Sequence, residues 1–294
     1  MIRAEGQSTK AMMGQLIGNL LNVILDPILI SAFGMGITGA AVATVIGNVV
    51  GAGYYIVYFL RGNSILSIRI KDFTVKENVC GSVLAIGIPA SLGSLLMSVS
   101  QIVVNNRMAG YGDMALAGIG VAMKVMMITG MICIGFGQGI QPLLGYCVGA
   151  GLWERFKQIM KFSLAASFLL SAVMTGGCYL LKDRIAGMFL TDADALRYAV
   201  KFISILLSTS ILFGIFYVLN NALQAMGAAT SALVINLSRQ GIIYIPAIFI
   251  LQAVLQENGI VWAQPAADIL STIFVLLLFM RSLKKMQNRT GDTE

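Results

Sequence analysis

The chain has 294 residues, of which 57% are hydrophobic and only 11% are charged, with a mean hydropathy of +0.84. So few charged positions cannot cover a water-soluble surface, so the composition argues against a soluble helical bundle and predicts an integral membrane protein. The sequence contains no histidine, which removes histidine-based catalytic triads and histidine metal ligands, and we predict a protein that is not an enzyme. Its four cysteines have no paired spacing and its glycines form no cofactor-binding motif, so we expect no bound metal and no cofactor.

Eight apolar runs reach the length of about 20 residues that a helix needs to cross the hydrocarbon of a bilayer. We therefore predict an all-α integral membrane protein with eight transmembrane helices. In chain order the runs cover residues 10–32, 37–60, 79–104, 114–148, 159–181, 202–225, 231–255 and 259–280. The first run is too long for a cleaved signal peptide and has no cleavage-type flank, so we expect it to remain as a helix.

The net charge of +7 has a topological explanation. With the N-terminus inside, thirteen lysines and arginines fall on the cytoplasmic side and five on the outer side, as the positive-inside rule requires. Both termini are therefore expected in the cytoplasm, with the protein in the cytoplasmic (inner) membrane. Membrane lipid is the expected partner, and the charge requires no nucleic acid.

Residues 4–46 and 225–269 resemble each other. Six residues between 4 and 24 recur 221 positions later, and five between 36 and 46 recur 223 positions later. Such a repeat is typical of transporters with two similar lobes, yet only the second copy follows a full set of helices. We expect an N-terminally truncated chain of a twelve-helix transporter. Its expected parts are the last two helices of the N-terminal lobe (1–60), a cytoplasmic amphipathic linker (61–78), a six-helix C-terminal lobe (79–283) and a cytoplasmic tail (284–294).

All five prolines lie in predicted spans. A proline removes a backbone donor, which a membrane helix tolerates where neighbours or cavity water satisfy the freed carbonyl group. Four of them are predicted to bend their helices around a polar cavity: Pro27, Pro89, Pro142 and Pro246. The alternative is that glycine and proline are simply common in membrane helices.

Polar side chains in the first two spans form the first candidate site. Asn22 precedes Asp26 by four residues and shares its helical face, while Thr44 on the next span is placed to face them across the hairpin. A carboxylate, an amide oxygen and a hydroxyl suit a proton or a sodium ion. The alternative is that Asp26 makes a structural hydrogen bond.

Three further ionisable residues lie inside spans: Lys124, Arg239 and Asp268. A charge at the bilayer centre costs about 2.5–3.5 kcal/mol, so each needs a partner or a function. We expect structural pairing among them, with a positive substrate cavity as the alternative. Gln138 and Gln141, on the glycine-rich stretch before Pro142, are additional candidates for the cavity lining.

Several motifs together resemble the multidrug and toxic compound extrusion (MATE) transporters. They occur in the same order as in that family and extend over essentially the whole chain. The motifs are RAEG at 3–6, NVILDPI at 22–28, GMGITGAAVAT at 34–44, GIP at 87–89, GQGIQP at 137–142 and SRQ at 238–240.

This resemblance implies two six-helix lobes and export of organic cations, drugs or other amphiphiles in exchange for protons or sodium ions by alternating access. The chain is most similar to the DinF-like branch, whose cation site combines an aspartate on helix one with three residues matched here by Asn22, Asp26 and Thr44. The second-lobe acids of other branches have no counterpart in residues 91–101 or 211–224.

Two alternatives stay open. A flippase for lipid-linked sugars has the same architecture, and it requires Lys124 and Arg239 both to line a charged cavity. The third hypothesis is a fragment that transports nothing.

Overall fold

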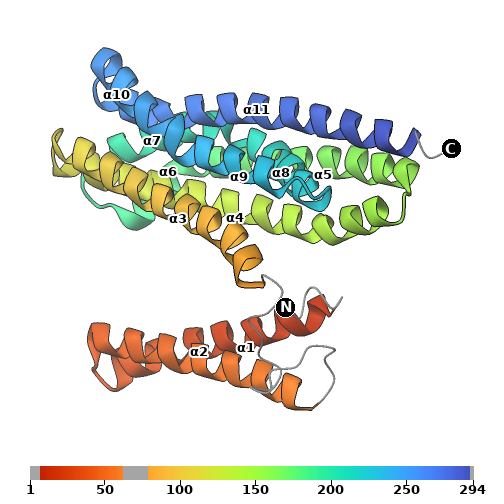
Figure 1. The fold of residues 1–294 in the computed structure, drawn as a ribbon. Coiled ribbons are helices and arrows are strands. Elements are labelled where there is room, and N and C mark those ends of the chain that lie inside the picture. Colours follow the sequence, from red (N-terminus) through yellow and green to blue (C-terminus); the bar gives the residue numbers. More distant parts are fainter. Residues whose placement is uncertain (1–6, 62–78, 292–294) are drawn as a thin grey trace. The chain divides into compact units, whose positions relative to one another are not determined.

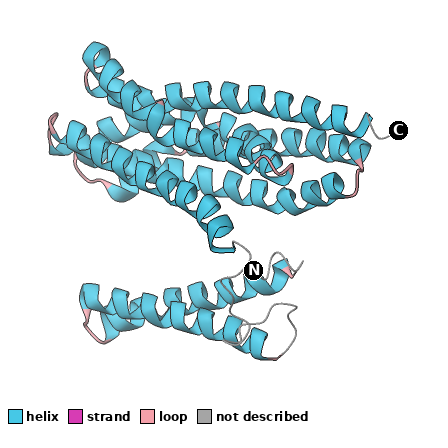
Figure 2. Ribbon diagram, in the orientation of Figure 1, coloured by secondary structure: helices cyan, strands magenta, loops and turns pink. Residues whose placement is uncertain are grey.

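The computed structural model describes residues 7–61 and 79–291, and this part of the chain is helical with no β-strand (Figure 2). Contacts divide the chain into two compact units, residues 1–80 and 81–294, which are described separately (Figure 1). The predicted linker at 61–78 lies outside the described residues, apart from Arg61. The all-helical prediction is confirmed.

The first unit is a helical hairpin. Helix α1 (Ser8–Pro27) runs directly into a π-helical turn, η1 (Ile28–Ala32), and a short turn leads into α2 (Gly36–Leu60). Proline cannot donate a backbone hydrogen bond, and the regular α-helical pattern ends at Pro27 itself. The first predicted span is therefore helical throughout but changes its winding beside Asp26.

Glycines bring the two helices of this hairpin into backbone contact. A Cβ atom on Gly18 would lie 2.8 Å from the carbonyl oxygen of Gly47, and one on Gly47 would lie 2.6 Å from that of Gly18. Tyr55 adds a hydrogen bond from its hydroxyl to the carbonyl oxygen of Ala11 at 2.6 Å. Small residues allow such close approach of membrane helices, and here they fix the register that sets Asn22 against α2.

The second unit begins with long helices and ends with a helical hairpin (Figure 1). Its elements are α3 (Val79–Ala109), α4 (Asp113–Gly149), α5 (Trp153–Leu180), α6 (Lys182–Phe189), α7 (Ala193–Ser210), α8 (Leu212–Ala225), α9 (Ala229–Leu237), η3 (Ser238–Ile242), α10 (Tyr244–Leu255) and α11 (Glu257–Gly291).

Helix α5 shows how this unit is adapted to lipid. One face carries large apolar side chains that are strongly exposed, Phe162 at 73%, Leu169 at 65% and Val173 at 62%. The opposite face buries small polar residues at four-residue intervals, namely Ser163, Ser167, Ser171 and Thr175. Small polar residues inside and large apolar residues outside are typical of helices that pack in a membrane.

The sixth predicted span is broken. Helices α7 and α8 meet at a 45° bend at Ile211 instead of forming one continuous helix. The hydroxyl of Ser171 lies 2.8 Å from the carbonyl oxygen of Ile211, and the hydroxyls of Thr175 and Ser210 are 2.8 Å apart. Side chains of α5 thus satisfy polar groups at the break, as the bilayer interior requires.

Within residues 7–61 and 79–291, six helical segments are long and apolar enough to cross a membrane, and the bent pair of α7 and α8 makes up to seven. The remaining predicted span falls on α3, which is helical over 31 residues, although the side chains of its first twelve lie outside the described set. The chain is therefore an integral membrane protein with the expected helical architecture.

The seventh predicted span contains a second irregularity. Between α9 and α10, residues 238–242 form the π-helical segment η3, which includes Arg239. Ser100 of α3 donates a hydrogen bond to the carbonyl oxygen of Gln240 in this segment. Pro246 follows it within α10, so the irregular winding in this span precedes the proline.

Candidate functional sites

Asn22 and Thr44 meet across the hairpin of the first unit. The side-chain amide nitrogen of Asn22 donates to the hydroxyl oxygen of Thr44 at 3.2 Å, and this hydroxyl donates to the carbonyl oxygen of Ala40 at 2.9 Å. The bond uses the amide NH₂ group of Asn22 and leaves its amide oxygen for another partner. The expected contact between the two predicted residues is thus present.

Asp26 lies one helical turn beyond Asn22 on the same face of α1. Its Oδ1 atom is buried and has no hydrogen-bond partner among the described residues. The π-helical turn begins two residues later, directly after Pro27. A buried carboxylate oxygen without a donor is costly in an apolar medium unless a proton, a cation or another donor satisfies it.

A second polar centre lies inside the second unit. The Nε atom of Arg239 donates to Oδ1 of Asp268 at 2.8 Å, and the side-chain amide of Gln264 donates to the same oxygen at 3.0 Å. Both side chains of the ion pair are almost completely buried, at 6% and 1% exposed. The prediction that the intramembrane charges pair with one another is correct for Arg239 and Asp268.

Aromatic residues of α8 surround the guanidinium group of Arg239. Its central carbon lies 4.9 Å from the ring centre of Phe213, 4.6 Å from that of Phe216 and 5.5 Å from that of Tyr217. Its NH1 group also donates to the hydroxyl of Tyr217 at 3.1 Å. Sequence reasoning missed these residues, although their spacing of three and four positions places them on one helical face.

Lys124 does not belong to this centre. It is exposed, its ammonium nitrogen lies 5.5 Å from the ring centre of Phe189, and it forms no ion pair within the described part of the chain. The expectation that Lys124 pairs with Arg239 or Asp268 is therefore wrong. The rotation of α4 turns Lys124 outward, whereas neighbouring Val125 is buried.

The remaining predicted residues have different surroundings. Gln138 is exposed on α4, while Gln141 donates a long hydrogen bond of 3.4 Å to the side-chain oxygen of Gln224 on α8. Pro142 lies within α4, which stays a single α-helix to Gly149. Pro89 lies within α3, and its side chain falls outside the described set.

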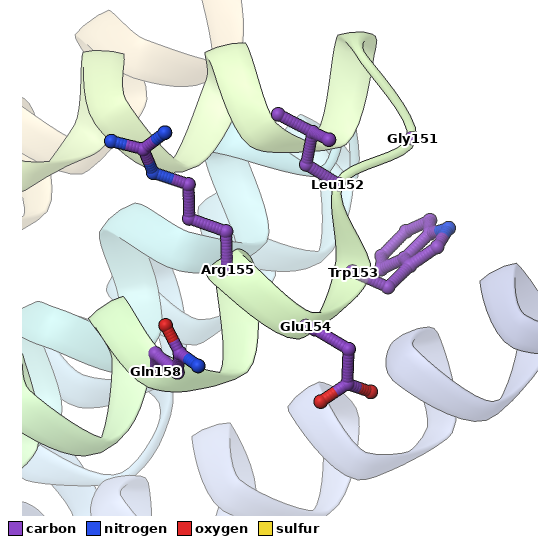
Figure 3. A pocket seen from close by; sticks show the side chains of 6 residues that line it. All are labelled: Gly151, Leu152, Trp153, Glu154, Arg155 and Gln158. Atoms are coloured by element: carbon purple, nitrogen blue, oxygen red, sulfur yellow. The ribbon is translucent and has the colours of Figure 1, made fainter.

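Among the described residues, two open clefts lie in loop regions of the second unit. The larger, about 750 Å³, surrounds the turn between α4 and α5, where Trp153, Glu154 and Arg155 point in different directions (Figure 3). The other, about 630 Å³, has a lining of mixed charge that includes Asp194 and Arg197.

These features define the class of protein. Several apolar helices are long enough to span a bilayer, two have π-helical interruptions, and ionisable groups are buried inside the spans. Membrane proteins place ionisable residues within spans where these pair with one another or act on ions and substrates. The arrangement is that of an integral membrane protein with several spans and polar centres within them.

Sequence comparison establishes the family. The MatE family model matches residues 89–250, so the chain belongs to the MatE family. Multidrug export protein MepA of Staphylococcus aureus strain MSSA476 is 31% identical over 276 residues, and that of Staphylococcus saprophyticus is 29% identical over 276 residues. Each match covers 94% of this chain and 61% of the relative, so the chain spans about three fifths of the length of these relatives.

Solved structures give the same fold. An outward-facing multidrug resistance MATE family transporter matches with a TM-score of 0.86 at 20% identity, covering 98% of this chain and 65% of the other. The Vibrio cholerae MATE transporter VcmN in its bent form matches with a TM-score of 0.81 at 20% identity, covering 97% and 65%. The all-helical membrane architecture thus agrees with the fold of known MATE transporters.

Proposed function

We propose that the chain acts in secondary active export of organic cations, drugs or other amphiphiles, in exchange for protons or sodium ions. The observation that carries the proposal is the polar group in the first unit, where Asn22 bonds to Thr44 and Asp26 holds a buried oxygen with no partner among the described residues. An acceptor set of this kind suits a small cation.

The names of the relatives support the substrate class. The MepA proteins are described as multidrug export proteins, and they share sequence over 94% of this chain. The structures of MATE transporters in outward-facing and bent forms support an alternating-access cycle for the proposed transport. In such a cycle, moving one charge across the membrane contributes about 2.3 kcal/mol per 100 mV.

We place the chain in the cytoplasmic (inner) membrane, with both termini in the cytoplasm. This orientation puts thirteen lysines and arginines on the cytoplasmic side and five outside. On the outer side, Lys201 approaches Glu257 at 4.0 Å, and Asp192 caps α7 by accepting from the backbone nitrogens of Asp194 and Ala195. These acidic residues offset part of the positive charge on the outer side.

Efflux of a fluorescent organic cation tests the proposal. The 294-residue chain is expressed in bacteria that lack their own drug exporters, and ethidium loss is followed under an imposed proton or sodium gradient. We expect efflux above the empty vector that depends on one of these gradients, and we expect Asp26→Asn to abolish that dependence. Asp113→Asn, at an exposed carboxylate that begins α4, is the control and is expected to keep it.

Two outcomes contradict the proposal. Unchanged gradient-dependent efflux in Asp26→Asn removes Asp26 from the coupling step. Absence of efflux from well-expressed wild type supports the hypothesis of a chain that transports nothing.

The flippase alternative required Lys124 and Arg239 to line one charged cavity. Arg239 is instead 5% exposed and enclosed by α8 and α11.

A further inference from the structure

The Asp268 carboxylate is bound asymmetrically. Its Oδ1 atom accepts from two donors, Arg239 at 2.8 Å and Gln264 at 3.0 Å. Its Oδ2 atom is buried and has no hydrogen-bond partner among the described residues. One oxygen therefore holds the carboxylate in place, while the other is left as an acceptor inside a residue that is 1% exposed.

Arg239 has support that does not depend on the charge of Asp268. Its guanidinium group lies within 5.5 Å of the centres of three rings, and its NH1 group donates to the hydroxyl of Tyr217. Aromatic faces stabilise a cation, and they do so most where water is excluded. The guanidinium group thus keeps partners even when the neighbouring carboxyl group is neutral.

The other titratable groups around Asp268 are few. Helix α8 contributes Tyr217, η3 contributes Arg239, and α10 contributes Tyr244, which is 3% exposed and close enough to interact electrostatically with the carboxylate. Helix α9 carries no ionisable residue. Helix α7 also packs on α11, but its Lys201 faces Glu257 at the start of α11.

We infer that Asp268 is a proton-binding site of the second unit, with Oδ2 as the atom that takes the proton. An O–H bond forms at Oδ2 with a proton from solvent, and Oδ1 stays a carbonyl-type acceptor for Arg239 and Gln264. No hydrogen bond of the site breaks. The net charge of the ion pair changes from zero to +1, and this charge rests on the guanidinium group between the rings of Phe213, Phe216 and Tyr217.

Arg239 and Gln264 are positioning residues in this proposal, because they hold Oδ1 and leave Oδ2 open. The site is separate from Asp26 in both sequence and compact unit. The inference also does not depend on transport, since proton binding is measurable on the purified chain alone.

Infrared difference spectroscopy tests the assignment. The full chain in lipid nanodiscs is compared at acidic and neutral pH, and the carbonyl stretch of a protonated, buried carboxylic acid is recorded with and without ¹³C-labelled aspartate. We expect an isotope-sensitive band that Asp268→Asn removes, and that the exposed control Asp113→Asn and the first-unit variant Asp26→Asn both retain. Persistence of every band in Asp268→Asn overturns the proposal. A change that follows sodium concentration at constant pH also overturns it.

A second variant keeps the test valid if Asp268→Asn does not fold. Gln264→Leu removes one donor to Oδ1 and changes neither charge of the ion pair. A carbonyl group that loses a hydrogen bond vibrates at higher frequency, so we expect the assigned band to move upward in this variant. A band that stays in place in folded Gln264→Leu protein is not that of Asp268.

Discussion

The guanidinium group of Arg239 and the carboxylate of Asp268 lie 29 residues apart in the chain and 2.8 Å apart in space. Arg239 belongs to the π-helical segment η3, whereas Asp268 lies in α11. The pair joins the irregular part of one span to a regular part of the next. It also draws in α8, whose Tyr217 accepts from the same guanidinium group.

Removing one partner of this pair is expected to destabilise the second unit more than removing both. Arg239→Met leaves a buried carboxylate without its cation, at a cost of about 3–5 kcal/mol in the free energy of unfolding. The double variant Arg239→Met with Asp268→Leu leaves no charge and is expected to recover most of that loss. Denaturant unfolding followed by circular dichroism measures both. Equal losses in the single and double variants contradict this account.

Replacing Thr44 tests the hydrogen bond across the first hairpin. Thr44→Val keeps the shape of the side chain but removes the acceptor for Asn22, whereas Thr44→Ser keeps the hydroxyl. Hydrogen bonds between membrane helices contribute about 0.6 kcal/mol on average, so both variants are expected to fold. We expect only Thr44→Val to weaken the gradient dependence of ethidium efflux. Identical behaviour of the two variants excludes a role for the hydroxyl.

The glycine contact between α1 and α2 predicts a position-specific effect of alanine. In Gly47→Ala the new methyl group would lie 2.6 Å from the carbonyl oxygen of Gly18, whereas in Gly53→Ala it meets nothing within 4 Å. Overpacking of this kind costs about 1–3 kcal/mol. We expect Gly47→Ala to lower the unfolding midpoint and Gly53→Ala to leave it unchanged. Equal midpoints would show that α1 and α2 can move apart at Gly47 without loss of stability.

A similar comparison tests the packing beside the bend between α7 and α8. An alanine at Gly214 places its methyl carbon in steric overlap with the carbonyl oxygen of Ser167, so the break must shift or α5 must move. Gly177→Ala in α5 meets nothing within 4 Å and replaces glycine by a better helix former, which favours folding by about 1 kcal/mol. In lipid nanodiscs, we expect the thermal unfolding midpoint to fall in Gly214→Ala and to rise in Gly177→Ala. A stabilised Gly214→Ala protein contradicts the packing described for this bend.

Hydrophobic patterning located the spans well but could not show their breaks. The run at 202–225 is predominantly apolar, yet it forms α7 and α8 at 45°. Helix α5 packs at the break, where Ser171 bonds to the carbonyl oxygen of Ile211 and Ser167 lies against Gly214. No proline occurs in this run to signal a bend. Pro142, by contrast, lies within a helix that is one continuous element. Local composition thus indicates the length of the run at 202–225, whereas its break at Ile211 has no proline to signal it.

Site prediction succeeded where the partners were close in the chain. Asn22 and Thr44 lie on consecutive helices of a hairpin, so a turn of predictable length brings them together. The pairing of Arg239 with Asp268 was one of several combinations, and the sequence could not exclude Lys124 because helix rotation decides which charge faces inward. Gln264 precedes Asp268 by four residues and was identifiable from that spacing, whereas the approach of Tyr217 from α8 was not.

The π-helical segment at Ser238–Ile242 also bears on how this span tolerates change in length. A π turn accommodates one residue more than an α turn, because its hydrogen bonds reach one residue further along the chain. Deleting a single residue there restores regular winding, so α9 and α10 keep their lipid-facing and core-facing sides. Arg239 lies within this segment, so the deletion changes the direction of its side chain relative to Asp268. We therefore expect a one-residue deletion to preserve membrane insertion and to disrupt the buried ion pair.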